Sequence, residues 1–186
     1  MDHFAIGRDP KAKFLKKLWY LAKNPTGSVS AVKNRLQNAK KVSTLENELA
    51  EISGLSPAIF HHKIRQVEHH RSHLASAFFA SPFDDAACVS IDGSGDFTTT
   101  MTGIGKGNDI EVLASVDFPH SIGIFYTAFT QLLGFPHYGD EYKVMGMAPY
   151  GRPKYVDKLE KIIHLTDNGL FRLALKYFRK GTEGVI

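Results

Sequence analysis

The segment from His69 to Asp96 (HHRSHLASAFFASPFDDAACVSIDGSGD) constrains this sequence most, because a helix-forming stretch leads into an apolar strand and a glycine turn. His69 and His73 are four residues apart and would project from one face of a helix. Asp92 ends the apolar run, and α/β sheets usually carry ligand chemistry at the carboxyl ends of strands. Two imidazoles and a carboxylate suit a divalent transition metal. The pattern therefore predicts a metal site at His69, His73 and Asp92.

Chance is the competing interpretation of the histidine pair, since the chain has nine histidines. The zinc peptidase motif H-E-x-x-H requires a glutamate as general base, and this sequence has His70 at that position. A peptidase of that type is therefore excluded. His70 would lie about 100° around the helix from His69 and face elsewhere.

Two short segments suggest contacts with an anion. Gly93, Ser94 and Gly95 would let backbone N–H groups approach a phosphate. Ser121 would cap a helix whose first amides face outward, and Gly123 would leave space there for a nucleotide. The alternatives are a tight turn without a ligand and an ordinary capped helix. The pair Asp140 and Lys143 fits either a structural contact or a substrate contact.

The composition is that of a globular protein, with 43% hydrophobic and 23% charged residues in a chain of 186. The single cysteine, Cys88, excludes an internal disulfide and lies in an apolar run, which predicts a buried side chain. No apolar stretch is long enough to span a bilayer, and the N-terminus lacks a signal peptide. We therefore expect a cytoplasmic protein without membrane contact.

The first 41 residues are basic, with ten Lys or Arg against two acidic residues, whereas the remainder has thirteen basic and seventeen acidic residues. Such an arm could bind an anionic surface or simply present a solvated helix face. The chain has no nucleic-acid-binding motif, so nucleic acid is not an expected partner.

The hydrophobic pattern divides the chain into a helical basic segment, residues 1–55, and a mixed part, residues 56–186. Residues 86–92 form a continuous apolar run that predicts a strand buried on both faces. The Gly107–Asp109 turn predicts a hairpin between the strands that flank it. The helices expected are 11–22, 30–42, 43–52, a short one from Pro57, 72–80, 122–133, 140–147 and 155–163; the strands expected are 64–67, 86–92, 98–104, 110–118 and 169–173.

Three runs make a more specific match: VEHHRSHLASAFFASPFDDAACVSIDGSGDF, FPHSIGIFYTAFTQLLGF and YGDEYKVMGMAPYG. They resemble the carbamoyltransferase family of nodulation and antibiotic-tailoring enzymes, over residues 64–178. The resemblance implies an α/β fold, part of an actin-like ATPase (ribonuclease H-like) half-domain. Its mixed sheet and helices would follow the basic helical segment.

The resemblance also implies a chemistry. In the family, a C-terminal domain makes carbamoyl-adenylate from carbamoyl phosphate and ATP, and the first domain passes the carbamoyl group to an acceptor hydroxyl beside Fe(II). His69, His73 and Asp92 match the metal positions. The nucleotide-facing positions matched are Gly93, Ser94, Gly95, Ser121 and Gly123. The catalytic base is not identified by the match; His120 and His137 are the candidates.

The chain departs from the family at both ends. It lacks the usual opening strand and glycine turn with a catalytic histidine, and it ends before the adenylate-forming domain. We therefore expect a portion that is inactive alone and reaches carbamoyl phosphate only through the missing domain. Uncovered apolar residues such as Phe125, Phe129, Leu132 and Leu133 favour a homodimer. The alternative is a non-catalytic remnant that binds a protein partner.

Overall fold

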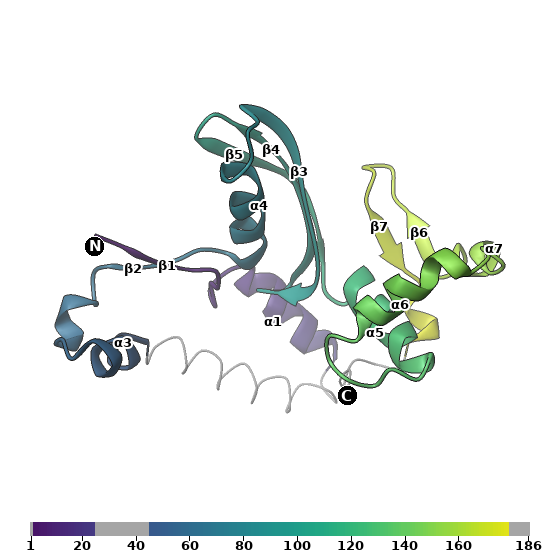
Figure 1. Cartoon of the computed structure of the whole chain (residues 1–186), viewed down its shortest axis with the longest axis horizontal. Coiled ribbons are helices and arrows are strands. Elements are labelled where there is room, and N and C mark those ends of the chain that lie inside the picture. The colour runs from purple at the N-terminus through teal and green to yellow at the C-terminus, as the bar shows by residue number, and fades with distance from the viewer. Residues whose placement is uncertain (1, 25–44, 179–186) are drawn as a thin grey trace.

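The computed structural model describes residues 2–24 and 45–178 (Figure 1). Its strands form three small sheets, with the orders β1-β2, β3-β4-β5 and β6-β7. Helices pack beside these sheets, so the predicted mixed α/β class is confirmed. The helix expected over residues 30–42 lies outside the described residues. No helix within 2–24 or 45–178 combines the length and the apolar character needed to cross a membrane.

The central sheet consists of β3 (Asp85–Gly95), β4 (Thr98–Lys106) and β5 (Asp109–Asp117), all antiparallel. The predicted hairpin between β4 and β5 is confirmed, and Gly107 adopts the positive φ of 55° that its tight turn needs. At the other end of the sheet, Asp96 and Phe97 turn β3 into β4 with φ values of 50° and 81°. This second turn lies beside the predicted metal site.

Helix α4 (His69–Phe79) covers one face of the central sheet (Figure 1). Leu74 and Phe78 of the helix pack with Cys88 and Met101 of the sheet, so the predicted burial of the thiol is confirmed. The prediction that β3 is buried on both faces is wrong for these residues. Burial alternates along the strand, and Val89 keeps 60% of its surface exposed. A continuous apolar run does not reveal which face a neighbour covers.

The N-terminal segment is joined to the rest of the chain by contacts across long sequence separations. Strand β1 (Phe4–Ile6) is followed directly by Gly7 and pairs in parallel with β2 (Ile64–Gln66). The expectation that the chain lacks an opening strand is therefore wrong. The predicted first helix is present as α1 (Phe14–Lys23). Lys13, just before it, forms an ion pair with Asp117 at the end of β5. The two parts that the sequence pattern separates at residue 55 therefore contact each other in the folded chain.

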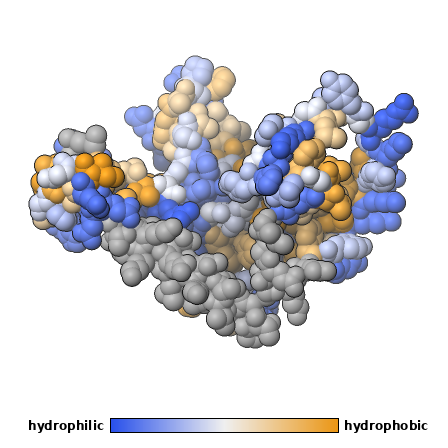
Figure 2. Space-filling view, turned by 60° about the horizontal axis from the view of Figure 1, so that its bottom comes forward, coloured by the Kyte–Doolittle hydropathy of each residue, from blue (hydrophilic) through white to orange (hydrophobic). Residues whose placement is uncertain are grey.

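The next elements along the chain are α3 (Leu45–Ser53) and a short 3₁₀ helix, η2 (Pro57–Ile59), both close to the predicted ranges. Hydrophobic residues gather on the surface at this end of the molecule (Figure 2). Ile52 is 85% exposed, and Leu55 and Ile59 are also exposed.

The C-terminal part contains α5 (Ile122–Leu132), α6 (Glu141–Met147), α7 (Val156–Leu159) and a small hairpin of β6 (Ile163–Leu165) and β7 (Phe171–Leu173). Leu170, Phe171 and Leu173 form a second core with Val116 of β5. The final strand was predicted. Ile163, however, begins β6 instead of ending a helix, because hairpin pairing with β7 extends the backbone there.

Candidate metal centre

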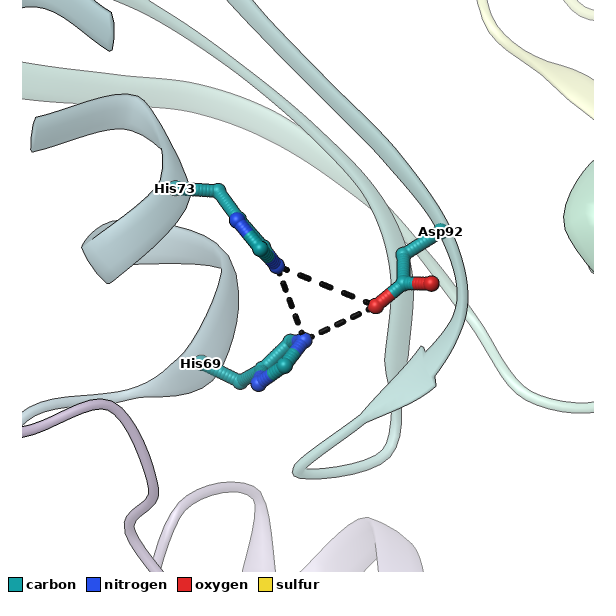
Figure 3. Close-up of side chains that lie close together, drawn as sticks. All are labelled: His69, His73 and Asp92. Carbon is teal, nitrogen blue, oxygen red and sulfur yellow. Dashed lines mark hydrogen bonds and ion pairs between the residues drawn. The ribbon is translucent and has the colours of Figure 1, made fainter. Parts of the chain in front are cut away.

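Three side chains converge where helix α4 meets the end of strand β3 (Figure 3). The Nε2 atom of His69 lies 2.8 Å from Oδ2 of Asp92 and 3.0 Å from Nε2 of His73. The third separation, from His73 Nε2 to Asp92 Oδ2, is 3.8 Å. Across residues 2–24 and 45–178, these three make the one group of His, Cys, Asp or Glu with metal-ligand spacing.

The spacing of the three atoms fits a single ion. Metal–ligand bonds of about 2.0–2.2 Å place neighbouring ligand atoms roughly 3.0–3.5 Å apart. Two of the three separations lie near that range, and the third needs only a small rotation of the exposed His73 ring. A set of two imidazoles and one carboxylate also leaves coordination positions open for a substrate. The chemistry of this donor set therefore suits a divalent transition metal.

The local sequence places the two histidines in the first turns of α4. Glu68 is the N-cap, and its side chain accepts a hydrogen bond of 2.9 Å from the backbone N–H of Arg71. The helix therefore begins at His69, and the i,i+4 spacing puts His73 one turn further along the same face. The predicted range of 72–80 is therefore wrong at its start, because the Glu68 cap begins the helix three residues earlier.

His70 has a structural role that the sequence reasoning missed. It is completely buried between the helix and the sheet. Its Nε2–H donates to the carbonyl of Thr98 at 3.0 Å, and the Ser90 hydroxyl donates to its Nδ1 at 2.8 Å. Burial lowers the pKa of His70, because the charged ring would lose its hydration. The neutral ring thus fixes α4 against β3 and β4. Because His70 lies between His69 and His73 in the helix, this also fixes the position of the site.

The Asp92 carboxylate is oriented by the backbone N–H of the next residue, Gly93. Its Oδ1 accepts a hydrogen bond of 2.6 Å from the N–H of Gly93, which leaves Oδ2 directed at the histidines. Partial burial by itself would raise the pKa of Asp92, but the adjacent His69 ring and the N–H of Gly93 outweigh it and hold the pKa below its ordinary value. The carboxylate is therefore ionised at neutral pH, as a metal ligand must be.

The three glycines of the expected nucleotide-facing segments have different surroundings. A Cβ on Gly95 would lie 1.9 Å from Cδ2 of His69, so only glycine lets the ring take its place. A Cβ on Gly123 would lie 2.6 Å from the carbonyl carbon of Asp92. Gly93 has open space in that direction. Gly95 and Gly123 thus allow the site to assemble, and Gly93 leaves room beside it.

Gly93, Ser94 and Gly95, predicted as a turn, are instead the last residues of strand β3, and Ser121 joins helix α5 to them. Its hydroxyl oxygen accepts a hydrogen bond of 3.0 Å from Ile124 N–H, which confirms the predicted N-cap, and its proton is donated to Gly93 O at 2.6 Å. The side chain is fully buried. Its hydrogen bonds therefore hold α5 to the end of β3.

The two candidate bases bond to other parts of the chain. His120 accepts a hydrogen bond of 3.1 Å at Nδ1 from Leu173 N–H, and burial, with the charge of Arg172, lowers its pKa. His137 is exposed, and its backbone N–H donates to Asp140. Asp140 in turn pairs with Lys143 at 2.7 Å, the structural contact weighed above. Neither histidine forms a hydrogen bond with the metal-ligand cluster in the part of the chain described.

Comparison with known proteins decides the family. The sequence matches the family "Carbamoyltransferase N-terminus" over residues 3–185, almost the whole chain. The chain belongs to this family. As a carbamoyltransferase N-terminal domain, it also has relatives among nodulation proteins, in line with the resemblance seen in the sequence motifs.

Three relatives illustrate the extent of the similarity. An uncharacterized protein of Synechocystis sp. is 40% identical over 193 residues, which cover 98% of this chain and 30% of that protein. The nodulation protein NolNO of Sinorhizobium fredii is 40% identical over 61% of this chain and 17% of its own length. NolO of Bradyrhizobium diazoefficiens is 39% identical over 59% of this chain and 20% of its own length. The chain thus spans less than a third of each of these relatives.

Proposed function

We propose that this carbamoyltransferase N-terminal domain binds Fe(II), or another divalent metal, through His69, His73 and Asp92. Beside that metal it would bind a carbamoyl-adenylate, whose carbamoyl group would pass to the hydroxyl of a small-molecule acceptor with AMP as the leaving group. The observation that carries the proposal is the convergence of three ligand atoms, from α4 and β3, next to the glycines at the end of β3. A partial actin-like ATPase half-domain is the fold we propose for this arrangement.

Each residue of the site has a separate role in the proposed binding. His69 and His73 would contribute imidazole nitrogen ligands, and Asp92 would contribute a carboxylate whose surroundings favour its ionised form. A bound divalent ion would neutralise phosphate charge and polarise the carbamoyl carbonyl, which is otherwise a poor electrophile. The absence of a side chain at Gly93 leaves room for the ligand's phosphate. We assign neither His120 nor His137 as the base, because Leu173 N–H occupies Nδ1 of His120 and, among the described residues, no hydrogen bond joins either ring to the three ligand residues.

Transfer by these residues alone is not part of the proposal. The relatives are more than three times as long as the aligned region, and the adenylate would come from sequence outside it. The proposed role of the domain is to hold the metal and to orient the activated carbamoyl group.

Calorimetric titration with Mn(II) or Co(II) tests the proposal directly. The wild-type chain should bind one ion, and the double variant His69→Ala, His73→Ala should lose that binding. A matched control removes two exposed histidines elsewhere, as His61→Ala, His62→Ala, which should leave the affinity unchanged. Equal binding by the wild type and the His69, His73 variant would eliminate the site.

A further inference from the structure

Asp96, which is not one of the three ligand residues, connects the metal centre to two distant segments. Its Oδ2 accepts a hydrogen bond of 3.0 Å from the backbone N–H of His69, the first residue of α4. The same oxygen accepts a second hydrogen bond, of 2.6 Å, from the backbone N–H of Asp9. One carboxylate therefore joins the β3–β4 turn, the start of α4 and the loop after β1.

That loop in turn contacts the ring of His69. The Nδ1–H of His69 donates to the carbonyl oxygen of Gly7 at 3.3 Å, while Nε2 faces Asp92 and His73. The loop lies close against α4, since a Cβ on Gly7 would be only 3.0 Å from the hydroxyl oxygen of Ser72. The ring is therefore held from both sides, by a carbonyl at Nδ1 and by the cluster at Nε2.

We propose that Asp96 is a positioning residue of the metal centre. By fastening the Gly7–Asp9 loop to the start of α4, it keeps the Gly7 carbonyl against Nδ1 of His69. That hydrogen bond holds the proton on Nδ1, so that Nε2 offers its lone pair to the ion. The inference rests on the proposed metal binding and adds a residue that supports a ligand without contacting the ion.

Physical chemistry supports this role. Histidines that bind a metal almost always donate their second N–H to a carbonyl or carboxylate, and losing such a partner typically costs about 10–100-fold in metal affinity. The negative charge of Asp96 also lies at the N-terminus of an 11-residue helix, where the helix dipole favours an anion. Both effects act on His69 without any contact between Asp96 and the ion.

Two substitutions separate this role from a role in folding. Asp96 has a positive φ of 50°, a conformation that asparagine and glycine tolerate. Asp96→Asn keeps the shape and one acceptor oxygen but loses the charge, and Asp96→Gly removes the acceptor. Asp109→Asn is the matched control, because Asp109 Oδ1 accepts a backbone N–H at 2.8 Å in the turn at the opposite end of β4.

The test combines Co(II) affinity by calorimetry with nitrogen NMR of the histidine rings in Zn(II)-loaded protein. Wild-type His69 should show a slowly exchanging Nδ1–H. Asp96→Gly should weaken binding by about 10–100-fold and speed exchange of that proton. Asp96→Asn should have a smaller effect of the same kind, and Asp109→Asn should have none.

The outcomes separate this inference from the proposed function. A wild-type chain that binds no metal refutes the proposed function and, with it, this inference. A wild-type chain that binds, with Asp96 variants of unchanged affinity and unchanged Nδ1–H exchange, refutes only the role of Asp96. Loss of the folded state in both variants would also overturn it, because Asp96 would then serve the fold as a whole.

Discussion

Replacement of Gly123 by alanine tests how closely helix α5 must approach the end of β3. Gly123 is the second residue of α5, and its added Cβ would lie 2.6 Å from the carbonyl carbon and oxygen of Asp92 and from the nitrogen of Gly93. Ordinary contacts between carbon atoms are about 3.5–4.0 Å, so the new methyl group would overlap three backbone atoms by roughly 1 Å. Backbone cannot rotate away as a flexible side chain can.

Two effects of opposite sign decide how much Gly123→Ala changes the free energy of unfolding. Alanine in place of glycine inside a helix stabilises by about 0.5–1 kcal/mol. Overpacking a tightly fitted position costs about 1–3 kcal/mol. We expect the overlap to dominate and Gly123→Ala to destabilise the fold by about 1–2 kcal/mol, which is roughly 2–8 °C in Tm for a chain of this size.

Gly146→Ala provides the matched control, because Gly146 lies in helix α6 and a Cβ there would meet nothing within 4 Å. It should raise Tm by about 1–4 °C. Thermal unfolding followed by circular dichroism gives both values, and Co(II) titration should show weaker binding for Gly123→Ala alone, since the overlap displaces the Asp92–Gly93 peptide. A Gly123→Ala protein as stable as the wild type, with equal Co(II) affinity, would refute this reasoning.

Three further predictions concern pH, activity and association. Burial lowers the pKa of His120 in the folded state, so its stabilising contribution is complete above the unfolded pKa near 6.5 and is lost as pH falls through the folded value. Denaturant unfolding measured from pH 7.5 to 5 should show the free energy of unfolding of the wild type falling with pH. In His120→Gln that fall should be shallower, by at most about 1.4 kcal/mol per pH unit. The isolated chain should not exchange pyrophosphate into ATP when given carbamoyl phosphate and Fe(II), and rapid exchange in a radiolabel assay would contradict the proposed role. Light scattering over a concentration series should show dimers, because Leu132 and Leu133 remain 76% and 55% exposed; a strictly monomeric chain would disagree.

Several elements could be predicted from the sequence because their signals are local. The hairpin of β4 and β5 follows from a glycine turn between two β-branched runs, and Ser121 capped its helix as expected. The convergence of His69, His73 and Asp92 was foreseen for a similar reason. The i,i+4 spacing fixes one helical face, and the apolar run places the carboxylate close to the end of strand β3.

Other features depended on contacts between distant segments. Strand β1 has three residues and exists through its pairing with β2, about sixty positions later. His70 looked like a residue that merely faces away from the site, yet it is the buried anchor of α4. No local pattern could show this, because its partners Ser90 and Thr98 are 20 and 28 residues away.

The sequence by itself determined that His69, His73 and Asp92 would lie together, that a helix and a hairpin would flank them, and which family the chain belongs to. Only the tertiary structure decided what supports those residues: the Asp96 carboxylate that joins three segments, the close fit at Gly95 and Gly123, and the exposed outer face of β3. The reason is physical. Periodicity, turns and caps arise from interactions within a few residues, whereas packing and shared hydrogen bonds exist only after the folded chain brings distant segments together.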